Sequence, residues 1–358
     1  MTKLFEPLRI KDISLRNRIA VSPMCQYSSV DGYPNDWHLV HLGSRAVGGA
    51  GLVVIEATAV SPDGRISPAD SGIYYEDHVE SFAKIARFLK QHGACAGIQI
   101  AHAGRKASTN KPWDGNDHIG KEQGGWDTIA PSAIAFGGKL DKIPREMTLD
   151  DIARVQADFV SAAKRALAAE FECLEIHFAH GYLAHEFYSP LSNKRTDAYG
   201  GSFKNRIRFH METFAAVREV WPARLPLLAR LSVNDWDEGG VTLEESIELV
   251  KQLKAAGLDM IDVSHGMVTP NENIPWAPGM TIAFAARIRR EVDIATTTSW
   301  LITHAKQAED ALQAGKLDMV MLGRELLRDP YWPYHAAIEL GSTASRDILP
   351  IQYARAVE

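Results

Sequence analysis

The chain has 358 residues and a formal net charge of −6, with acidic and basic residues interspersed. This balance argues against a nucleic-acid or anionic-membrane partner and favours a small soluble ligand. Three cysteines, Cys25, Cys95 and Cys173, lie far apart without a C-x-x-C pair, which predicts neither a disulfide framework nor a cysteine-ligated cluster. Because no stretch approaches the ~18 uncharged apolar residues of a membrane helix, we expect a cytoplasmic protein in a reducing compartment.

Short apolar runs recur along the chain and indicate its fold class. They predict strands at residues 19–21, 52–56, 96–100, 173–177, 227–231, 260–263, 294–297 and 319–322. Runs such as LVVI and DMVML are almost continuously apolar, as strands covered on both faces are. Helical patterns lie between them, for example Ile152, Val155 and Phe159, and a Thr242–Glu245 capping pair. These repeats predict an α/β protein, a (β/α)8 TIM barrel forming a single domain over residues 1–358.

Two segments fall outside the repeats. Residues 8–15 precede the first strand and predict a β-hairpin that plugs the bottom of the barrel. Residues 101–147 form the longest unassigned stretch and contain Trp113, Trp126 and several glycines. Because a loop of this length is usually functional, we expect a lid over the barrel mouth after strand 3.

The stretch from residue 173 to 206 carries the densest chemistry. An apolar strand ends there in His177 and His180, and Tyr182 follows two residues later, so three proton-carrying side chains can converge on one small volume. Such histidines are often structural, and an H-x-x-H pair can also bind a metal. A metal-dependent hydrolase using His177 and His180 is therefore the alternative, although no zinc signature surrounds them. We favour a pair that donates two hydrogen bonds to a substrate oxygen, with Tyr182 as the acid.

Polar residues also follow the other strands, at the end of the barrel where active sites lie. They are SPMCQYS (22–28), Ala57 and Thr58, Gln99 with His102 and Arg105, Arg230, Ser299 with Trp300, and Gly323 with Arg324. Taken singly, Arg230 could be an ion-pair residue and Gln99 a capping amide. The last two strand ends commonly bind phosphate, so Gly323 and Arg324 predict a phosphate site, against the alternative of a helix-initial glycine beside a surface arginine.

Several stretches resemble one known family. SPMCQYS, QIAHAGRK, EIHFAHGYLAHEFYSPLSNKRTDAYGGS, ARLSVNDW and LGRELLRDPYW look like the Old Yellow Enzyme family of flavin-dependent ene-reductases, over nearly the whole chain. Cys25, Tyr27 and the C-terminal IQYARA place the resemblance nearest the bacterial branch of xenobiotic reductases and YqjM-like enzymes.

The resemblance implies bound FMN across the barrel mouth. Pro23, Met24 and Cys25 would lie on one side of it and Ala57 near the flavin N5. Gln99 would bind the pyrimidine edge and Arg230 would place its charge by N1 and O2. Trp300, Gly323 and Arg324 would hold the phosphate end. Cys25 would tune the flavin potential, or else be an inert buried thiol.

The resemblance also implies the reaction and its partners. Hydride from NADPH or NADH would pass through flavin N5 to the β-carbon of an α,β-unsaturated carbonyl compound, or to a nitro compound or quinone. His177 and His180 would bind the carbonyl oxygen, and Tyr182 would protonate the α-carbon.

Substrate contacts would come from Tyr27, from Trp300 and, in a homodimer or homotetramer, from Arg355 of a neighbouring subunit. Trp300 stands where many relatives have a small glycine, which predicts a narrow pocket for planar substrates. Residues 345–358 would then form a shared C-terminal arm; the alternative is a frayed, solvated tail.

Overall fold

Eight parallel strands form the centre of the protein in the computed structural model, which describes residues 2–356. In spatial order they are β11 (Ala295–Thr298), β10 (Met260–Ser264), β9 (Leu227–Ser232), β8 (Cys173–Phe178), β5 (Cys95–Ala101), β4 (Leu52–Ala59), β3 (Ile19–Val21) and β12 (Val320–Leu322). Between the outermost two, the Asp318 N–H donates to the Thr296 carbonyl at 3.0 Å, which closes the barrel. The predicted (β/α)8 barrel is confirmed, and all eight strands fall at the predicted places.

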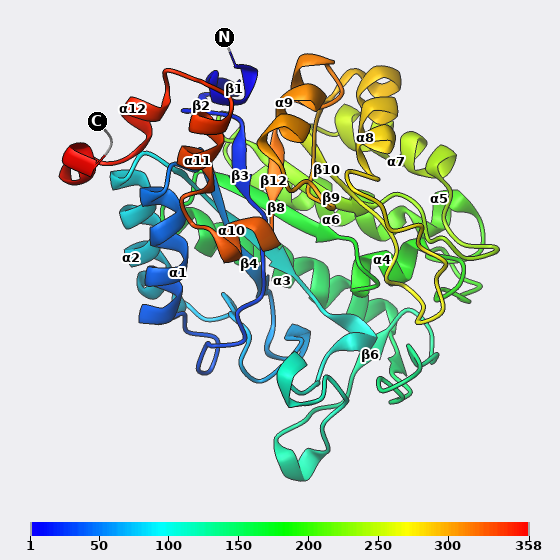
Figure 1. Ribbon diagram of the computed structural model, residues 1–358. Helices are drawn as coiled ribbons and strands as arrows, with labels where there is room; N and C mark the ends of the chain where they lie inside the picture. The colour runs from blue at the N-terminus through cyan, green and yellow to red at the C-terminus, as the bar shows by residue number, and fades with distance from the viewer. Residues whose placement is uncertain (1, 357–358) are drawn as a thin grey trace.

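Helices surround this barrel on the outside (Figure 1). They are α1 (Asp36–Val47), α2 (His78–Gln91), α3 (Leu149–Ala168), α4 (Leu183–Tyr188), α5 (Phe203–Arg206), α6 (Arg208–Val220), α7 (Leu243–Ala255), α8 (Ile282–Ile288), α9 (Ala305–Gln313), α10 (Arg324–Arg328), α11 (Trp332–Glu339) and α12 (Ser345–Ile348). Their sequences explain their starts: Thr148 caps α3 in a capping box with Asp151, and the Thr242 side chain accepts from the Glu245 N–H at the start of α7. No helix of the described part of the chain is both long and apolar enough to cross a membrane.

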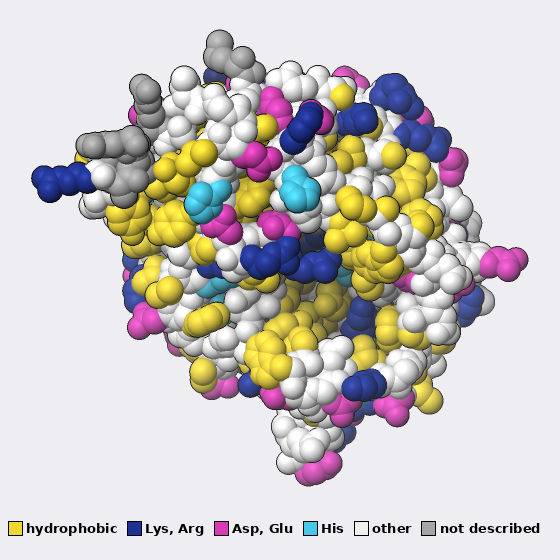
Figure 2. Space-filling model, in the orientation of Figure 1, with side chains coloured by type: hydrophobic (Ala, Val, Ile, Leu, Met, Phe, Trp, Pro, Cys, Tyr) yellow, Lys and Arg dark blue, Asp and Glu magenta, His cyan; other side chains and the backbone are white. Residues whose placement is uncertain are grey.

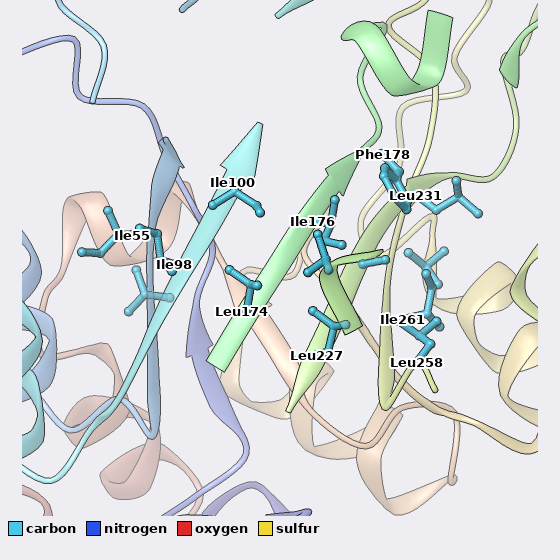
Figure 3. Close-up of a cluster of buried hydrophobic side chains, with 14 of the residues drawn as sticks. Ile55, Ile98, Ile100, Leu174, Ile176, Phe178, Leu227, Leu231, Leu258 and Ile261 are labelled. Carbon is cyan, nitrogen blue, oxygen red and sulfur yellow. The ribbon is translucent and has the colours of Figure 1, made fainter. Parts of the chain in front are cut away.

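Alternation along each strand separates the outer core from the barrel interior. Side chains such as Ile98, Ile100, Leu174 and Ile176 point outward and pack in the large core shared with the helices (Figure 3). Their neighbours in the sequence therefore point toward the barrel axis. This parity sends Gln99, Glu175, His177, Arg230, Asp262 and Ser264 inward.

Strand β4 changes its parity at a β-bulge. Ile55 pairs with Ile98, but Ala57 pairs with Gln99, so Glu56 is the extra residue. Without the bulge Glu56 would follow Leu52 and Val54 into the interior. Instead Ala57 faces inward, and Glu56 lies in a buried polar cluster with His38 and Ser71, at 3.8 Å and 3.3 Å.

The bottom of the barrel is closed by the predicted hairpin, β1 (Leu8–Ile10) and β2 (Ile13–Leu15), which pair antiparallel. Ile10 and Leu15 pack against interior side chains at this end, including Leu228, Met260 and Met321. Figure 1 shows the hairpin in dark blue, on the opposite side of the barrel from the segment that includes β6 (Ile129–Ala130).

Residues 101–147 contain a 3-10 turn, Gly104–Lys106, and the short strands β6 and β7 (Arg145–Glu146). Arg105 fixes the segment because its guanidinium donates to the carbonyls of Ile134 and Ala135 at 3.1 and 3.3 Å, and to that of Val268 at 2.6 Å. At the other end of the chain, α12 and a 3-10 turn, Ile351–Ala356, lie on the outer edge of the molecule (Figure 1, red). Of the predicted C-terminal arm, residues 357–358 lie outside the described part.

Candidate functional site

A cavity of about 320 Å³ opens at the C-terminal ends of the barrel strands, within the size range of ligand sites. Figure 2 shows this face as a hollow with Lys and Arg side chains along its rim. The cavity is lined by Ser22, Pro23, Met24, Cys25, Ala57, Gln99, His177, His180, Tyr182, Arg230, Ser299, Trp300, Leu301, Ile302, Thr303, Gly323, Arg324, Glu325 and Arg328. Residues at or after the ends of seven strands therefore line one cavity.

Charged and amide groups form the floor of this cavity. Arg230 makes a buried ion pair with Asp262 at 2.9 Å and donates to Ser299 Oγ at 2.8 Å. Gln99 Nε2 donates to Glu175 Oε1 at 2.6 Å. Burial raises the pKa of Glu175 to about 8, and the adjacent Asp262 adds to the rise. The floor thus holds one guanidinium with two carboxyl groups, of which one retains a proton near neutral pH.

His177 and His180 stand together above the floor, with ring centroids 5.0 Å apart and planes at 82°. Burial, and then the charge of Arg230, lower the pKa of both histidines well below their usual range. Both rings are therefore neutral, and each can donate only one N–H. His180 has a left-handed backbone (φ 62°), which the Ser232 hydroxyl holds by accepting its N–H at 2.9 Å.

Tyr182 lies beside His177, with ring centroids 5.2 Å apart. Burial raises the pKa of the Tyr182 phenol above its usual range, so the hydroxyl keeps its proton. Lys106 Nζ lies 5.0 Å from the Tyr182 ring centroid and donates to the His180 carbonyl at 2.8 Å. Cys25 packs nearby, and burial raises the pKa of its thiol well above the usual range, so the thiol is uncharged.

The outer wall combines an aromatic face with cationic groups. Trp300 packs against His265 and Trp276, with centroids 4.4 and 5.1 Å away. Gly323 precedes α10 and borders the cavity with Arg324 and Arg328. A Cβ added to Gly323 would meet only Met24 Sδ, at 3.5 Å, so this stretch of backbone is open to the cavity.

Two predicted substrate residues do not line this cavity. Like Cys25 and Tyr182, Tyr27 packs against a small apolar cluster of Ile66, Ala103 and Ala107. Arg355 lies exposed near the C-terminus, away from the cavity of its own chain. His102 and Arg105, which the strand-end inventory also included, are buried outside the cavity and hydrogen-bond to loop backbone, because the chain turns sharply after Ala101. The other twelve residues that were assigned to catalysis, cofactor binding or substrate binding all line the cavity.

Sequence reasoning missed Asp262, Ser264 and Lys106. Asp262 and Ser264 alternate along β10 in the phase that points inward, so strand parity combined with register could have found them. Lys106 ends the 3-10 turn Gly104–Lys106, and nothing in the sequence pattern indicates this turn or the position of the lysine.

Comparison with known proteins assigns the class of this site. The sequence profile of the NADH:flavin oxidoreductase / NADH oxidase family matches residues 3–342. An NADPH dehydrogenase of Geobacillus sp. (strain WCH70) is 47% identical over 356 residues, which cover 99% of this chain and 98% of that protein.

Solved structures agree with this assignment. Morphinone reductase in complex with tetrahydroNAD has a TM-score of 0.78 at 25% identity, covering 95% of this chain and 91% of that one. A 2-naphthoyl-CoA reductase complex with 2-naphthoyl-CoA has a TM-score of 0.86 at 26% identity, covering 97% of this chain. The present chain spans only 53% of that larger reductase.

Barrel, cavity and sequence profile together define a flavin-dependent oxidoreductase. The chain belongs to the NADH:flavin oxidoreductase / NADH oxidase family, which is the Old Yellow Enzyme family, and its cofactor is FMN. The alternative of a metal-dependent hydrolase is unsupported. Within residues 2–356 no group of three or more His, Cys, Asp or Glu side chains is arranged to hold a metal ion.

The donor set of the cavity fits FMN. Gln99 presents an amide, and Arg230 a cation, to the deep end of the cavity, where a flat ring with carbonyl and N–H edges needs them. Glu175 Oε2 has no hydrogen-bond partner in the described chain, so a polar atom at the floor is still unpaired. At the outer end, Arg324, Arg328 and the open backbone at Gly323 suit a phosphate.

Proposed function

We propose that the protein reduces electron-poor alkenes, above all α,β-unsaturated carbonyl compounds, with NADPH or NADH as the source of hydride. The observation that carries this proposal is the grouping of His177, His180 and Tyr182 in the cavity, with ring centroids 5.0 Å apart between the histidines and 5.2 Å apart between His177 and Tyr182. Two N–H donors can share one carbonyl oxygen, and a third group can deliver a proton elsewhere. Nitro compounds and quinones offer similar oxygens and would also be substrates.

His177 and His180 bind the substrate oxygen and stabilise the negative charge that develops on it. Because both rings are neutral, they donate hydrogen bonds without transferring a proton to the oxygen. FMN held in this cavity would supply the hydride that the β-carbon of the alkene accepts. Tyr182 donates its proton to the α-carbon, which completes the addition of two hydrogens, and solvent then returns a proton to Tyr182.

The remaining lining residues hold FMN. Gln99 would bind the pyrimidine edge, and Arg230 would place its positive charge by N1 and O2. Pro23, Met24, Cys25 and Ala57 form the wall beside the ring. Trp300, Gly323 and Arg324 would bind the phosphate end. The β-bulge at Glu56 supports this assignment for Ala57, because it places a small residue at the cavity in place of a carboxylate.

Substrate selection and assembly belong to the same proposal. Trp300 narrows the cavity and selects planar alkenes. Tyr27 packs against the same small apolar cluster as Tyr182 and would support the substrate from behind that side chain. Arg355, exposed on the outer edge, completes the site of a neighbouring subunit in a homodimer or homotetramer. The protein acts in the cytoplasm as a single barrel domain with its C-terminal arm.

The test is spectroscopic. The purified protein should be yellow, lose its flavin absorbance when NADPH is added without oxygen, and regain it on addition of cyclohexenone. In Tyr182→Phe the bleaching by NADPH should be unchanged, while the recovery with cyclohexenone slows about 10²-fold or more, the contribution typical of a positioned acid. Bleaching without any recovery in the wild type would refute the alkene assignment and leave the flavin assignment intact.

A further inference from the structure

Ser264 ends strand β10 and contacts two cavity residues through one hydroxyl. The Trp300 indole N–H donates to Ser264 Oγ at 2.6 Å, and His180 Nε2 lies 2.6 Å from the same oxygen. Ser264 is 0% exposed. The hydroxyl therefore has to satisfy both partners without solvent.

The chemistry of these groups determines which one donates. An indole N–H can only donate, so Ser264 Oγ accepts from Trp300. The hydroxyl hydrogen then needs an acceptor of its own, and within residues 2–356 His180 Nε2 is the remaining partner that the structure gives it. If Nε2 carried a proton, Ser264 would accept twice and its own hydrogen would be buried without a partner, which is costly. Nε2 is thus unprotonated, and the single proton of the neutral ring lies on Nδ1.

We propose that Ser264, oriented by Trp300, is a positioning residue that fixes His180 as the Nδ1–H tautomer and directs this N–H to the substrate oxygen. The inference rests on the proposed function and specifies the tautomer of His180, one of the two residues that bind the substrate oxygen. A ring with Nδ1 unprotonated would present an electron pair to the substrate oxygen, and would repel it.

Two neighbouring contacts support the assignment. Ser232 and Ser264 are register partners at the ends of β9 and β10, and both act on His180: Ser232 on its backbone N–H, Ser264 on its ring. His177 has the opposite tautomer. The Ala179 N–H donates to its Nδ1 at 3.4 Å, which favours a proton on Nε2. The two imidazoles would then offer Nε2–H from one ring and Nδ1–H from the other.

The direct test is the tautomer of His180 in the holoenzyme, measured by nitrogen NMR after labelling the histidines with ¹⁵N. The protonated and unprotonated nitrogens of a neutral imidazole give separate signals, and the His180 signals are those lost in His180→Asn. The wild type and Ser264→Thr should show a protonated Nδ1. Ser264→Ala and Trp300→Phe should move the signals toward the Nε2–H form. Ser232→Ala removes the hydrogen bonds to the His180 backbone N–H and the Gly266 carbonyl but none to the His180 ring, so it should keep the wild-type tautomer.

Kinetics provide the second readout. Ser264→Ala should slow reoxidation by cyclohexenone about 10-fold or more. The His180 N–H would then point away from the substrate oxygen in part of the molecules, which weakens its hydrogen bond in the transition state. Its reduction by NADPH should change far less, and Ser264→Thr should recover most of the reoxidation rate. A wild-type His180 protonated on Nε2, or a Ser264→Ala protein with the wild-type tautomer and rate, overturns the inference. Failure of the wild type to reduce cyclohexenone would instead refute the proposed function, and the NMR result would still decide the tautomer.

Discussion

Replacing Glu175 by Gln should stabilise the protein, and the gain should increase with pH. Glu175 is fully buried under the cavity, where its carboxyl accepts from Gln99 at 2.6 Å. A Gln side chain has nearly the same shape and can accept the same hydrogen bond. The substitution therefore removes the ionisable proton and little else.

The size of the gain follows from proton linkage. Burial raises the pKa of Glu175 from the 4.5 of a free side chain to about 8. Between these values the unfolded chain releases the proton and the folded chain keeps it, so rising pH favours unfolding by about 1.4 kcal/mol per unit. The stability contributed by Glu175 is complete below pH 4.5 and is lost as pH rises toward 8. The difference between Glu175→Gln and wild type should thus reach about 3 kcal/mol at pH 7 and level off above pH 8.

Urea unfolding of both proteins, followed by circular dichroism at several pH values from 5 to about 9, measures this difference. Asp262→Asn is the matched control, because it removes the negative neighbour and leaves Arg230 to pair with Glu175. In that background the pH dependence of the Glu175→Gln effect should be weaker but should persist, because burial, the larger cause of the raised pKa, is unchanged. A difference that stays constant from pH 5 to 8 in the wild-type background would refute the reasoning.

Three further predictions test other parts of the molecule. Trp300→Gly should raise activity on bulky enones relative to cyclohexenone; unchanged relative rates would exclude Trp300 as the selecting residue. Arg105→Met removes three hydrogen bonds to the carbonyls of Ile134, Ala135 and Val268 and should speed proteolysis within residues 101–147 at least about 10-fold, with the melting temperature as control. Deletion of residues 350–358 should weaken activity and reduce the oligomer size in gel filtration. Unchanged kinetics and oligomer size would refute the proposed role of the C-terminal arm in a neighbouring subunit's site.

Much of the fold could be predicted because parallel barrel strands are short, apolar and regularly spaced. The errors lie where local packing overrides the pattern. Strand β4 continues to Ala59, three residues beyond the expected end, because the bulge at Glu56 lets the chain go on pairing with β5. An acidic residue in LVVIEATA suggests that the strand stops, and only the cluster around His38 shows why it does not.

The site was predictable where chemistry is concentrated in one motif. His177, His180 and Tyr182 come from one strand end and its turn, so their convergence can be inferred from spacing alone. Ser264 could not be found in this way. It is an ordinary serine at a strand end, and its importance depends on a hydroxyl shared with Trp300, which is 36 residues away in the sequence. Side-chain partnerships of this kind follow from register around the barrel, which no local pattern contains.

The hairpin at the bottom of the barrel limits the order of events in catalysis. Ile10 and Leu15 seal that end with apolar contacts, so reagents cannot pass through the barrel from one side to the other. The nicotinamide donor and the proposed alkene acceptor should then enter and leave at the open end of the barrel. Each should inhibit binding of the other at high concentration. Double-reciprocal plots of rate against acceptor concentration, at several fixed NADPH concentrations, should give parallel lines, as expected for a ping-pong mechanism.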